Sequence, residues 1–347
     1  MSPPEIAEGI EAGSVVKVDP ERASHLAIPE RKNFGKVFSN FDDWEGMDAT
    51  EEALLAMTDE EKRQLKTVGL RYKFTDKSME AIQGLENIEN LSLGNNPKMT
   101  EKGMLLIGTL SGLKSLVYFD FHRKEMQPGE RASILTGQVF HEITTLNKIE
   151  RFYIYGYYLT DESFQHLSTD SNLKSLVIFG NSPLTQKSLK GISKLKNLES
   201  LTFHNHNWNG EGLNYLVNNS SLKSLNLLQD DLDDDGLKHL KNLRQLSNLV
   251  LKETKITDQG LKLISHLSNL TSLHLDDTGI TDAGMAVVSK LTNLEFLYLD
   301  DTAITRESLV HIKKLPKLKS LFTSGTVDNM IFKEYMKRRK ESLETSE

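Results

Sequence analysis

A repeat of 24 residues constrains the fold of this chain more than any other feature of its sequence. Leu249, Leu273 and Leu297 occupy the same position in three successive copies of one segment, each 24 residues after the last. A period of this length is typical of solenoids, in which each unit packs only on its two neighbours. We therefore expect an elongated array of repeats rather than a domain with one central core.

The same pattern continues towards the N-terminus and predicts eleven short strands. Each has the form L-x-L, in which a second inward residue follows the first by two positions, so that alternate side chains face the interior. Most intervals are 24 or 25 residues, but one of 36 residues places an insertion near residues 121–135. The first inward residues are Val68, Leu91, Leu116, Phe152, Leu176, Leu201, Leu225, Leu249, Leu273, Leu297 and Leu321.

A helix is predicted after each strand, because each unit continues with a Thr-Asp-x-Gly-Leu segment such as 257–261 or 281–285. Thr is a preferred N-cap, and Asp is stabilised in the first turn by the positive end of the helix dipole. Leu261, Ile264 and Leu267 then follow at helical spacing. The chain therefore alternates one strand with one helix throughout the array.

The regions outside the array predict three further parts. Residues 1–47 contain four prolines and no lasting apolar period, so we expect an irregular N-terminal arm. Residues 48–67 predict two short helices with Thr50 and Thr58 as N-caps, which would close the first repeat of an array over 68–327. Residues 328–347 predict a C-terminal capping helix and tail, beginning at Asp328 and containing four consecutive cations at 337–340.

This alternation at a 24-residue period resembles the leucine-rich repeat family over roughly residues 68–327. The form TxITDxGL is similar to the cysteine-containing repeats of F-box proteins and of bacterial arrays and effectors, although Thr254, Thr278 and Thr302 stand where that class has Cys. No F-box is matched in the N-terminal segment. The resemblance implies an α/β fold, a right-handed horseshoe-shaped solenoid with about eleven parallel strands on its concave face and helices on its convex face. It also implies a scaffold that binds proteins through the concave face.

Alternation along the strands predicts two outward side chains per strand, and these define the candidate partner-binding surface. The N-terminal half of this surface is apolar and aromatic, and the C-terminal half is polar and acidic. We expect the binding residues to be Val117, Phe119, Tyr153, Tyr155, Val177, Phe179, His204, Leu228, Lys252, Asp276, Tyr298 and Asp300.

The apolar patch on three adjacent strands, from Val117 to Phe179, has two interpretations. Exposed patches of this kind mark interaction sites, and aromatic side chains are enriched at interface hot spots. Alternatively, the insertion at 121–135 folds back and covers the patch, since it contains apolar residues of its own. Both interpretations remain open from the sequence.

Charge and composition narrow the classes of partner. A net charge of −7 argues against nucleic acid, and no apolar run is long enough to span a membrane. The aspartates at 230–235, 276–277 and 300–301 favour a solvated acidic rim over a calcium cage, and they would attract a partner with a basic surface. The first residues lack a signal-peptide pattern, and the sequence leaves the compartment of this soluble chain open. If a signal peptide has been removed, we expect an exported protein, either periplasmic or extracellular.

No constellation of residues predicts catalysis, a metal site or a cofactor. The chain has no Cys, and His204 and His274 lie three strand steps apart, about 14 Å, too far to share one zinc ion. We therefore expect a monomeric, non-enzymatic scaffold that binds a protein or peptide. The alternative is a receptor for a glycan or another small cell-envelope ligand, which would stack on the aromatic side chains.

Overall fold

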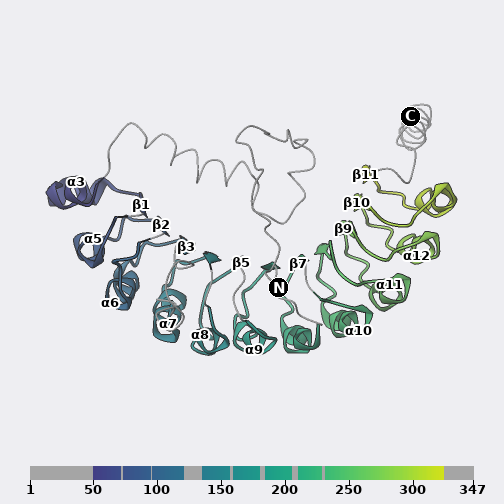
Figure 1. Ribbon diagram of the computed structural model, residues 1–347, viewed down its shortest axis with the longest axis horizontal. Coiled ribbons are helices and arrows are strands. Elements are labelled where there is room, and N and C mark those ends of the chain that lie inside the picture. Colours follow the sequence, from purple (N-terminus) through teal and green to yellow (C-terminus); the bar gives the residue numbers. More distant parts are fainter. Residues whose placement is uncertain are drawn as a thin grey trace, which may run out of the picture.

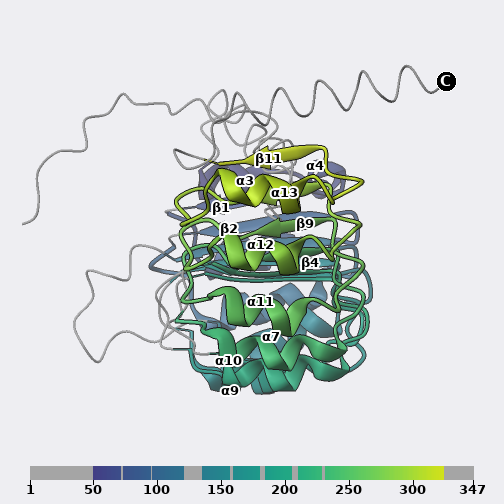
Figure 2. The ribbon, with the colours of Figure 1, turned by 90° about the vertical axis from the view of Figure 1, so that its right-hand side faces the viewer.

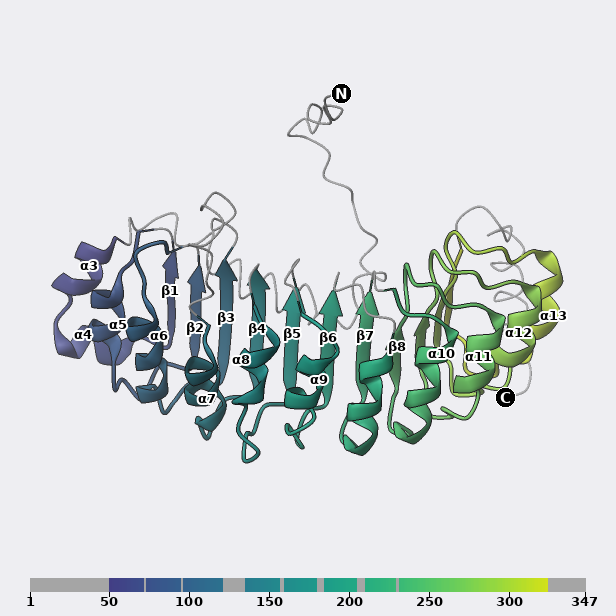
Figure 3. The ribbon, with the colours of Figure 1, turned by 60° about the horizontal axis from the view of Figure 1, so that its bottom comes forward.

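The chain forms an open α/β solenoid of the leucine-rich repeat type. The computed structural model describes residues 50–71, 73–94, 96–120, 135–156, 159–179, 184–204, 210–228 and 231–323. Eleven parallel strands lie side by side in sequence order in one sheet. Figure 1 shows the strands lining the inner side of an arc and the helices forming its outer side, and Figure 3 shows the strands parallel to one another.

All eleven predicted strands are present, and each contains the inward residue expected from the repeat. Neighbouring strands pair without an offset between repeats, so that Leu225, Leu249 and Leu273 are direct partners. The strands are β1 (Thr67–Arg71), β2 (Asn90–Gly94), β3 (Ser115–Asp120), β4 (Arg151–Gly156), β5 (Ser175–Phe179), β6 (Ser200–His204), β7 (Ser224–Leu228), β8 (Asn248–Val250), β9 (Ser272–His274), β10 (Phe296–Tyr298) and β11 (Ser320–Phe322).

The helices are short, and several repeats have a 3-10 helix in place of an α-helix, or directly before or after one. Among the described residues, α3 (Glu51–Ala56) and α4 (Asp59–Gln64) precede the first strand. The remaining α-helices are α5 (Asp76–Ile82), α6 (Glu101–Leu105), α7 (Gly137–Thr145), α8 (Asp161–Gln165), α9 (Lys187–Ile192), α10 (Asp234–Leu237), α11 (Asp258–Ile264), α12 (Asp282–Val288) and α13 (Leu309–Ile312). The 3-10 helices are η2 (Leu106–Thr109), η4 (Glu211–Asn218), η5 (Lys238–Asn242) and η6 (Arg306–Ser308).

One continuous apolar core runs through the solenoid between strands and helices. Its strand side consists of the inward leucines, such as Leu201, Leu225 and Leu249, which are 0% exposed. Its helix side consists of residues such as Leu261 and Ile264, which are 1% and 0% exposed. Because each inward side chain packs on its equivalents in adjacent repeats, the fold is stabilised mainly between nearest neighbours.

The Thr-Asp segment joins consecutive repeats, which goes beyond the expected role of capping one helix. Thr281 accepts a hydrogen bond from the backbone N–H of Ala283, as an N-cap does. Its own N–H and hydroxyl donate to the carboxylate of Asp258 in the previous repeat, at 2.9 and 2.6 Å. The same pair of bonds joins Thr100 to Asp76 and Thr305 to Asp282. Each Asp therefore connects its helix to the start of the next.

A second contact between repeats lies just before the strands, where lysine and glutamate alternate from one repeat to the next between β1 and β7. We call this series the Lys/Glu ladder, and its ion pairs within the described residues include Lys114–Glu89 at 2.9 Å and Lys174–Glu150 at 2.7 Å. Such exposed pairs contribute little to stability, because solvent and salt screen them. In order, the ladder positions hold Lys66, Glu89, Lys114, Glu150, Lys174, Glu199, Lys223, Ser247, Thr271, Glu295 and Lys319.

At the N-terminal end, α3 and α4 begin where the sequence indicates. Thr50 accepts a hydrogen bond from the N–H of Ala53, and Thr58 forms a capping box with Glu61. The predicted arm at 1–47, most of the insertion near 121–135 and the predicted capping helix at 328–347 lie outside the described residues.

Candidate functional site: the concave face

The concave face carries three rows of outward side chains, one more than the sequence pattern predicted. The additional row lies at the start of the strands, because every strand begins one residue before its first inward residue. We call it the first row, and the two predicted rows the second and third rows. The first row comprises Asn90, Ser115, Arg151, Ser175, Ser200, Ser224, Asn248, Ser272, Phe296 and Ser320.

The predicted second-row residues of the apolar patch contribute to packing more than to an accessible surface. Val117, Tyr153 and Val177 are only 6%, 6% and 2% exposed and pack together on β3, β4 and β5. A ligand on this face would reach little of them. The third row, whose side chains pack against them and are only partly buried, is the more accessible part of the apolar patch.

The third row forms a continuous stack of rings across β3 to β6, which we call the aromatic ladder. Phe119 and Tyr155 have ring centroids 5.0 Å apart, Tyr155 and Phe179 5.3 Å, and Phe179 and His204 4.6 Å. The planes of successive rings differ by 28° or less, so the faces are stacked on one another. Aligned strand registers bring equivalent side chains within stacking distance, each pair contributing about 0.5–1.5 kcal/mol.

The ladder is electrically neutral near pH 7. Burial raises the pKa values of Tyr153 and Tyr155, so both phenols stay protonated. Burial lowers the pKa of His204 and the nearby Glu253 carboxylate only partly opposes this, so its imidazole is mostly uncharged. The surface formed by these side chains is therefore apolar with polar edges.

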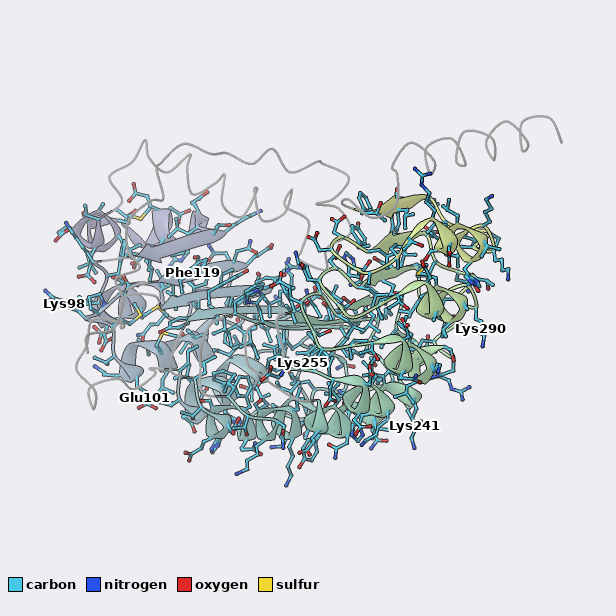
Figure 4. The ribbon with its side chains drawn as sticks, turned by 45° about the vertical axis from the view of Figure 1, so that its right-hand side comes forward. Lys98, Glu101, Phe119, Lys241, Lys255 and Lys290 are labelled. Atoms are coloured by element: carbon cyan, nitrogen blue, oxygen red, sulfur yellow. The ribbon has the colours of Figure 1, made fainter. Side chains whose placement is uncertain are left out.

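The aromatic ladder ends on both sides at residues without a ring. Gly94 is paired with Phe119 across β2 and β3, and a Cβ at Gly94 would approach the Cβ of Phe119 to 3.0 Å. Beyond His204, the paired residue on β7 is Leu228, which is partly buried. The predicted third-row residues from Phe119 to Leu228 thus form one contiguous surface, and Figure 4 shows Phe119 on its strand layer.

A second aromatic stack lies on β9 to β11, where the sequence pattern indicated a polar and acidic surface. Rings of His274 and Tyr298 have centroids 3.8 Å apart, and those of Tyr298 and Phe322 are 4.3 Å apart. His274 is 1% exposed, and its Nε2 lies 3.1 Å from the hydroxyl of Ser272. Of these residues only Tyr298 was predicted in the site, although aromatic residues at 24-residue intervals were a visible signal.

Carboxylates gather where the last strands end. Glu253, Asp277 and Asp301 have positive φ angles near 55°, which turn the chain away from the sheet after β8, β9 and β10. The predicted residue Lys252 lies 3.3 Å from the Glu253 carboxylate and 3.8 Å from that of Asp277.

The predicted pair Asp276 and Asp300 also joins two repeats. Asp276 is only 6% exposed and accepts a hydrogen bond from the N–H of Asp300 at 3.1 Å. The C-terminal end of the concave face, away from the aromatic ladder, therefore holds Lys252, Asp276 and Asp300 together. Within the described residues, no group of three His, Asp or Glu side chains is arranged to hold a metal ion.

No helix within the described ranges has the length and apolar character needed to cross a bilayer. No protein-family model and no curated protein sequence matches the chain. Among solved structures, similarity is found to internalin C2 and to internalin F, both from Listeria monocytogenes. The first is 16% identical with a TM-score of 0.39, and the match covers 77% of this chain and 84% of that one. The second is 18% identical with a TM-score of 0.38, covering 78% of this chain and 92% of that one. The fold of this chain is established by its own sheet, register and repeat spacing.

Proposed function

We propose that the chain is a protein- or peptide-binding scaffold that uses the third row of its concave face. The observation that carries the proposal is the aromatic ladder from Phe119 to His204, which presents a neutral, largely apolar strip across four strands. Soluble proteins seldom leave such a strip on a concave surface unless it meets a partner. With Leu228 it extends over five strands, about 19 Å at the usual strand spacing.

The arrangement of the rings favours a polypeptide over a glycan. Sugars stack on the open faces of aromatic rings, but the faces in the ladder lie against neighbouring rings at 4.6–5.3 Å. The ring edges are left for a ligand, and they suit aliphatic or aromatic side chains that insert between or along them. The alternative of a glycan receptor therefore has no supporting feature in the ladder.

The far end of the concave face supports a partner with a basic surface. The turns after β8, β9 and β10 contain five carboxylates and one cation, Lys252. The carboxylates belong to Glu253, Asp276, Asp277, Asp300 and Asp301. This excess raises the rate of encounter with a positively charged surface and orients the partner along the concave face. The apolar ladder would then supply most of the affinity.

Panning a random peptide library on the purified chain tests the proposal. We expect the recovered peptides to be rich in aromatic and aliphatic residues, and to bind Tyr155→Lys and Phe119→Lys at least tenfold more weakly, since a buried hot spot is worth about 2 kcal/mol or more. Either substitution places a charge among the stacked rings. Binding is measured by fluorescence anisotropy with a synthetic peptide.

The matched control is Tyr215→Lys, because Tyr215 belongs to η4 on the helical side and is 38% exposed. Circular dichroism establishes that each variant is folded at the assay temperature. Equal affinity of the peptides for wild type and for both ladder variants would overturn the proposed site. If the chain bound glycans on an array and panning selected no peptides, the proposed ligand class would be overturned.

A further inference from the structure

A band of cations lies on one lateral edge of the solenoid, where helices end and the chain returns to the next strand. We call it the basic edge, and it extends from α9 to the segment before β11. All its members are exposed. They are Lys190, Lys196, Lys238, Lys241, Arg244, Lys262, Lys290, Lys313, Lys314 and Lys317.

Carboxylates are nearly missing from the same edge. In the segments 188–199, 212–223, 238–247, 262–271, 286–295 and 310–319 the only acidic residues are Glu199 and Glu295. Both are neutralised within the Lys/Glu ladder, by Lys223 at 2.8 Å and by Lys319 at 2.6 Å. The cations of the basic edge therefore add to one another.

The helix dipole does not account for this concentration of charge. Cations stabilise the C-terminal end of any helix, and every repeat presents such an end on this edge. The equivalent segments of the first repeats, 80–89, 104–114, 141–150 and 164–174, nevertheless hold six carboxylates and only three Lys or Arg residues. The basic edge is thus specific to the C-terminal repeats and needs another explanation.

The basic edge is flat because the strands pair without an offset from one repeat to the next. Figure 2 shows the connecting loops of successive repeats ending along a common line. Figure 4 shows Lys241 and Lys290 projecting from the helical side of different repeats. At about 10 Å per packed helix, the edge spans roughly 50 Å from α9 to α13.

The overall negative charge does not cancel this local field. The carboxylates after β9 and β10 lie at the opposite ends of the strands, and the five residues from Thr271 to Leu275 span about 17 Å when extended. The Debye length at physiological ionic strength is about 8 Å, so charges on the far edge are largely screened. Asp234 and Asp258, one helical turn before Lys238 and Lys262, offset part of the charge of these two lysines. The other cations of the basic edge act on a partner with little opposing charge.

We propose that the basic edge docks on an anionic lipid surface. A planar layer of headgroups matches a flat edge that extends over several repeats, whereas a polymer contacts a protein along a narrow line. Nine of the ten cations are lysines, whose point charge suits diffuse attraction to headgroups, while arginine is the residue that reads phosphates in a bidentate manner. Docking by this edge leaves the concave face open to the side.

Sedimentation with phosphatidylcholine vesicles, with and without phosphatidylserine, tests this proposal. We expect the full chain to sediment with the anionic vesicles at low salt and to be released at high salt. Because each cation near an anionic surface is worth about 1 kcal/mol, or about fivefold in affinity, the triple variant Lys241→Gln, Lys290→Gln, Lys314→Gln should bind roughly a hundredfold more weakly.

The control triple variant is Lys73→Gln, Lys77→Gln, Lys98→Gln, which changes the net charge equally in repeats that lack the basic edge; it should bind like wild type. Equal losses in the two triple variants would overturn the assignment of the edge, as would equal binding to vesicles with and without phosphatidylserine. Tighter binding to duplex DNA or to polyglutamate than to the vesicles would assign the edge to a nucleic acid or an acidic protein instead.

Discussion

At the residue scale, the fourth position of the Thr-Asp-x-Gly segment has no room for an additional carbon atom. A Cβ added at Gly284 would overlap the carboxylate of Asp258 in the previous repeat, and Gly260 stands in the same relation to Asp234. Serine at this position donates a hydrogen bond. Ser78 donates to the carboxylate of Glu51 at 2.5 Å, and Ser308 donates to that of Asp282. Ser163 and Ser188 donate to backbone carbonyls instead. The position therefore accepts a residue with no side chain or one that can donate a hydrogen bond.

Gly284→Ala should lower the free energy of unfolding by roughly 1–3 kcal/mol, because the methyl group overlaps a carboxylate that already binds Thr281. Gly284→Ser should cost less, since its hydroxyl donates to Asp258. Urea unfolding of the two variants and wild type measures the order. A Gly284→Ala variant more stable than wild type, the usual result inside a helix, would contradict this explanation.

At the scale of elements, carboxylates in the first turn of one helix hold the start of the next. Asp282 of α12 accepts hydrogen bonds from the N–H and hydroxyl of Thr305 and from the hydroxyl of Ser308. Burial raises the pKa of Asp282, but the bonds from Ser308 and Thr305 outweigh it and hold the pKa below its ordinary value. The charged carboxylate is therefore favoured by the folded state.

A folded pKa below the unfolded value of about 3.9 means that this stabilisation is complete above pH 4 and is lost as the pH falls through the folded value. Asp282→Asn should cost about 1–2 kcal/mol at pH 7, and its deficit relative to wild type should shrink as the pH falls below 4. Urea unfolding as a function of pH measures the difference. A deficit that stays constant over this range would refute the assignment, and Glu86→Gln in an exposed loop serves as control.

At the scale of the whole molecule, the nearest-neighbour core predicts how the solenoid unfolds. Phe203 on β6 is 0% exposed in the centre of the array, so Phe203→Ala should cost about 3–5 kcal/mol. Because each repeat contacts only its neighbours, we expect the parts of the variant on either side of β6 to unfold separately instead of in one cooperative transition. Hydrogen exchange should then show two protection levels, one for each half; a single uniform loss of protection would contradict the expectation.

The sequence predicted the elements of this array better than its surface. The positions of Leu249 and its equivalents placed all eleven strands, because a 24-residue period leaves one phase for the inward side chains. The repeat period could not show how deeply each outward side chain is buried. Tyr153 in the second row is 6% exposed, whereas Tyr155 in the aromatic ladder is only partly buried, because burial depends on packing between adjacent strands. The repeat period also could not show that Asp258 binds Thr281, since a helix cap is local and this bond joins two repeats.

In the Lys/Glu ladder the sign of the charge alternates with every repeat from β1 to β7. Removing the repeat of Lys174 alone would bring Glu150 beside Glu199, whereas removing two consecutive repeats would again place a lysine next to a glutamate. Two consecutive repeats are thus the smallest segment of the β1 to β7 region that can be duplicated or deleted without placing like charges next to each other in the Lys/Glu ladder. Growth of the array by duplication in steps of two would leave this signature.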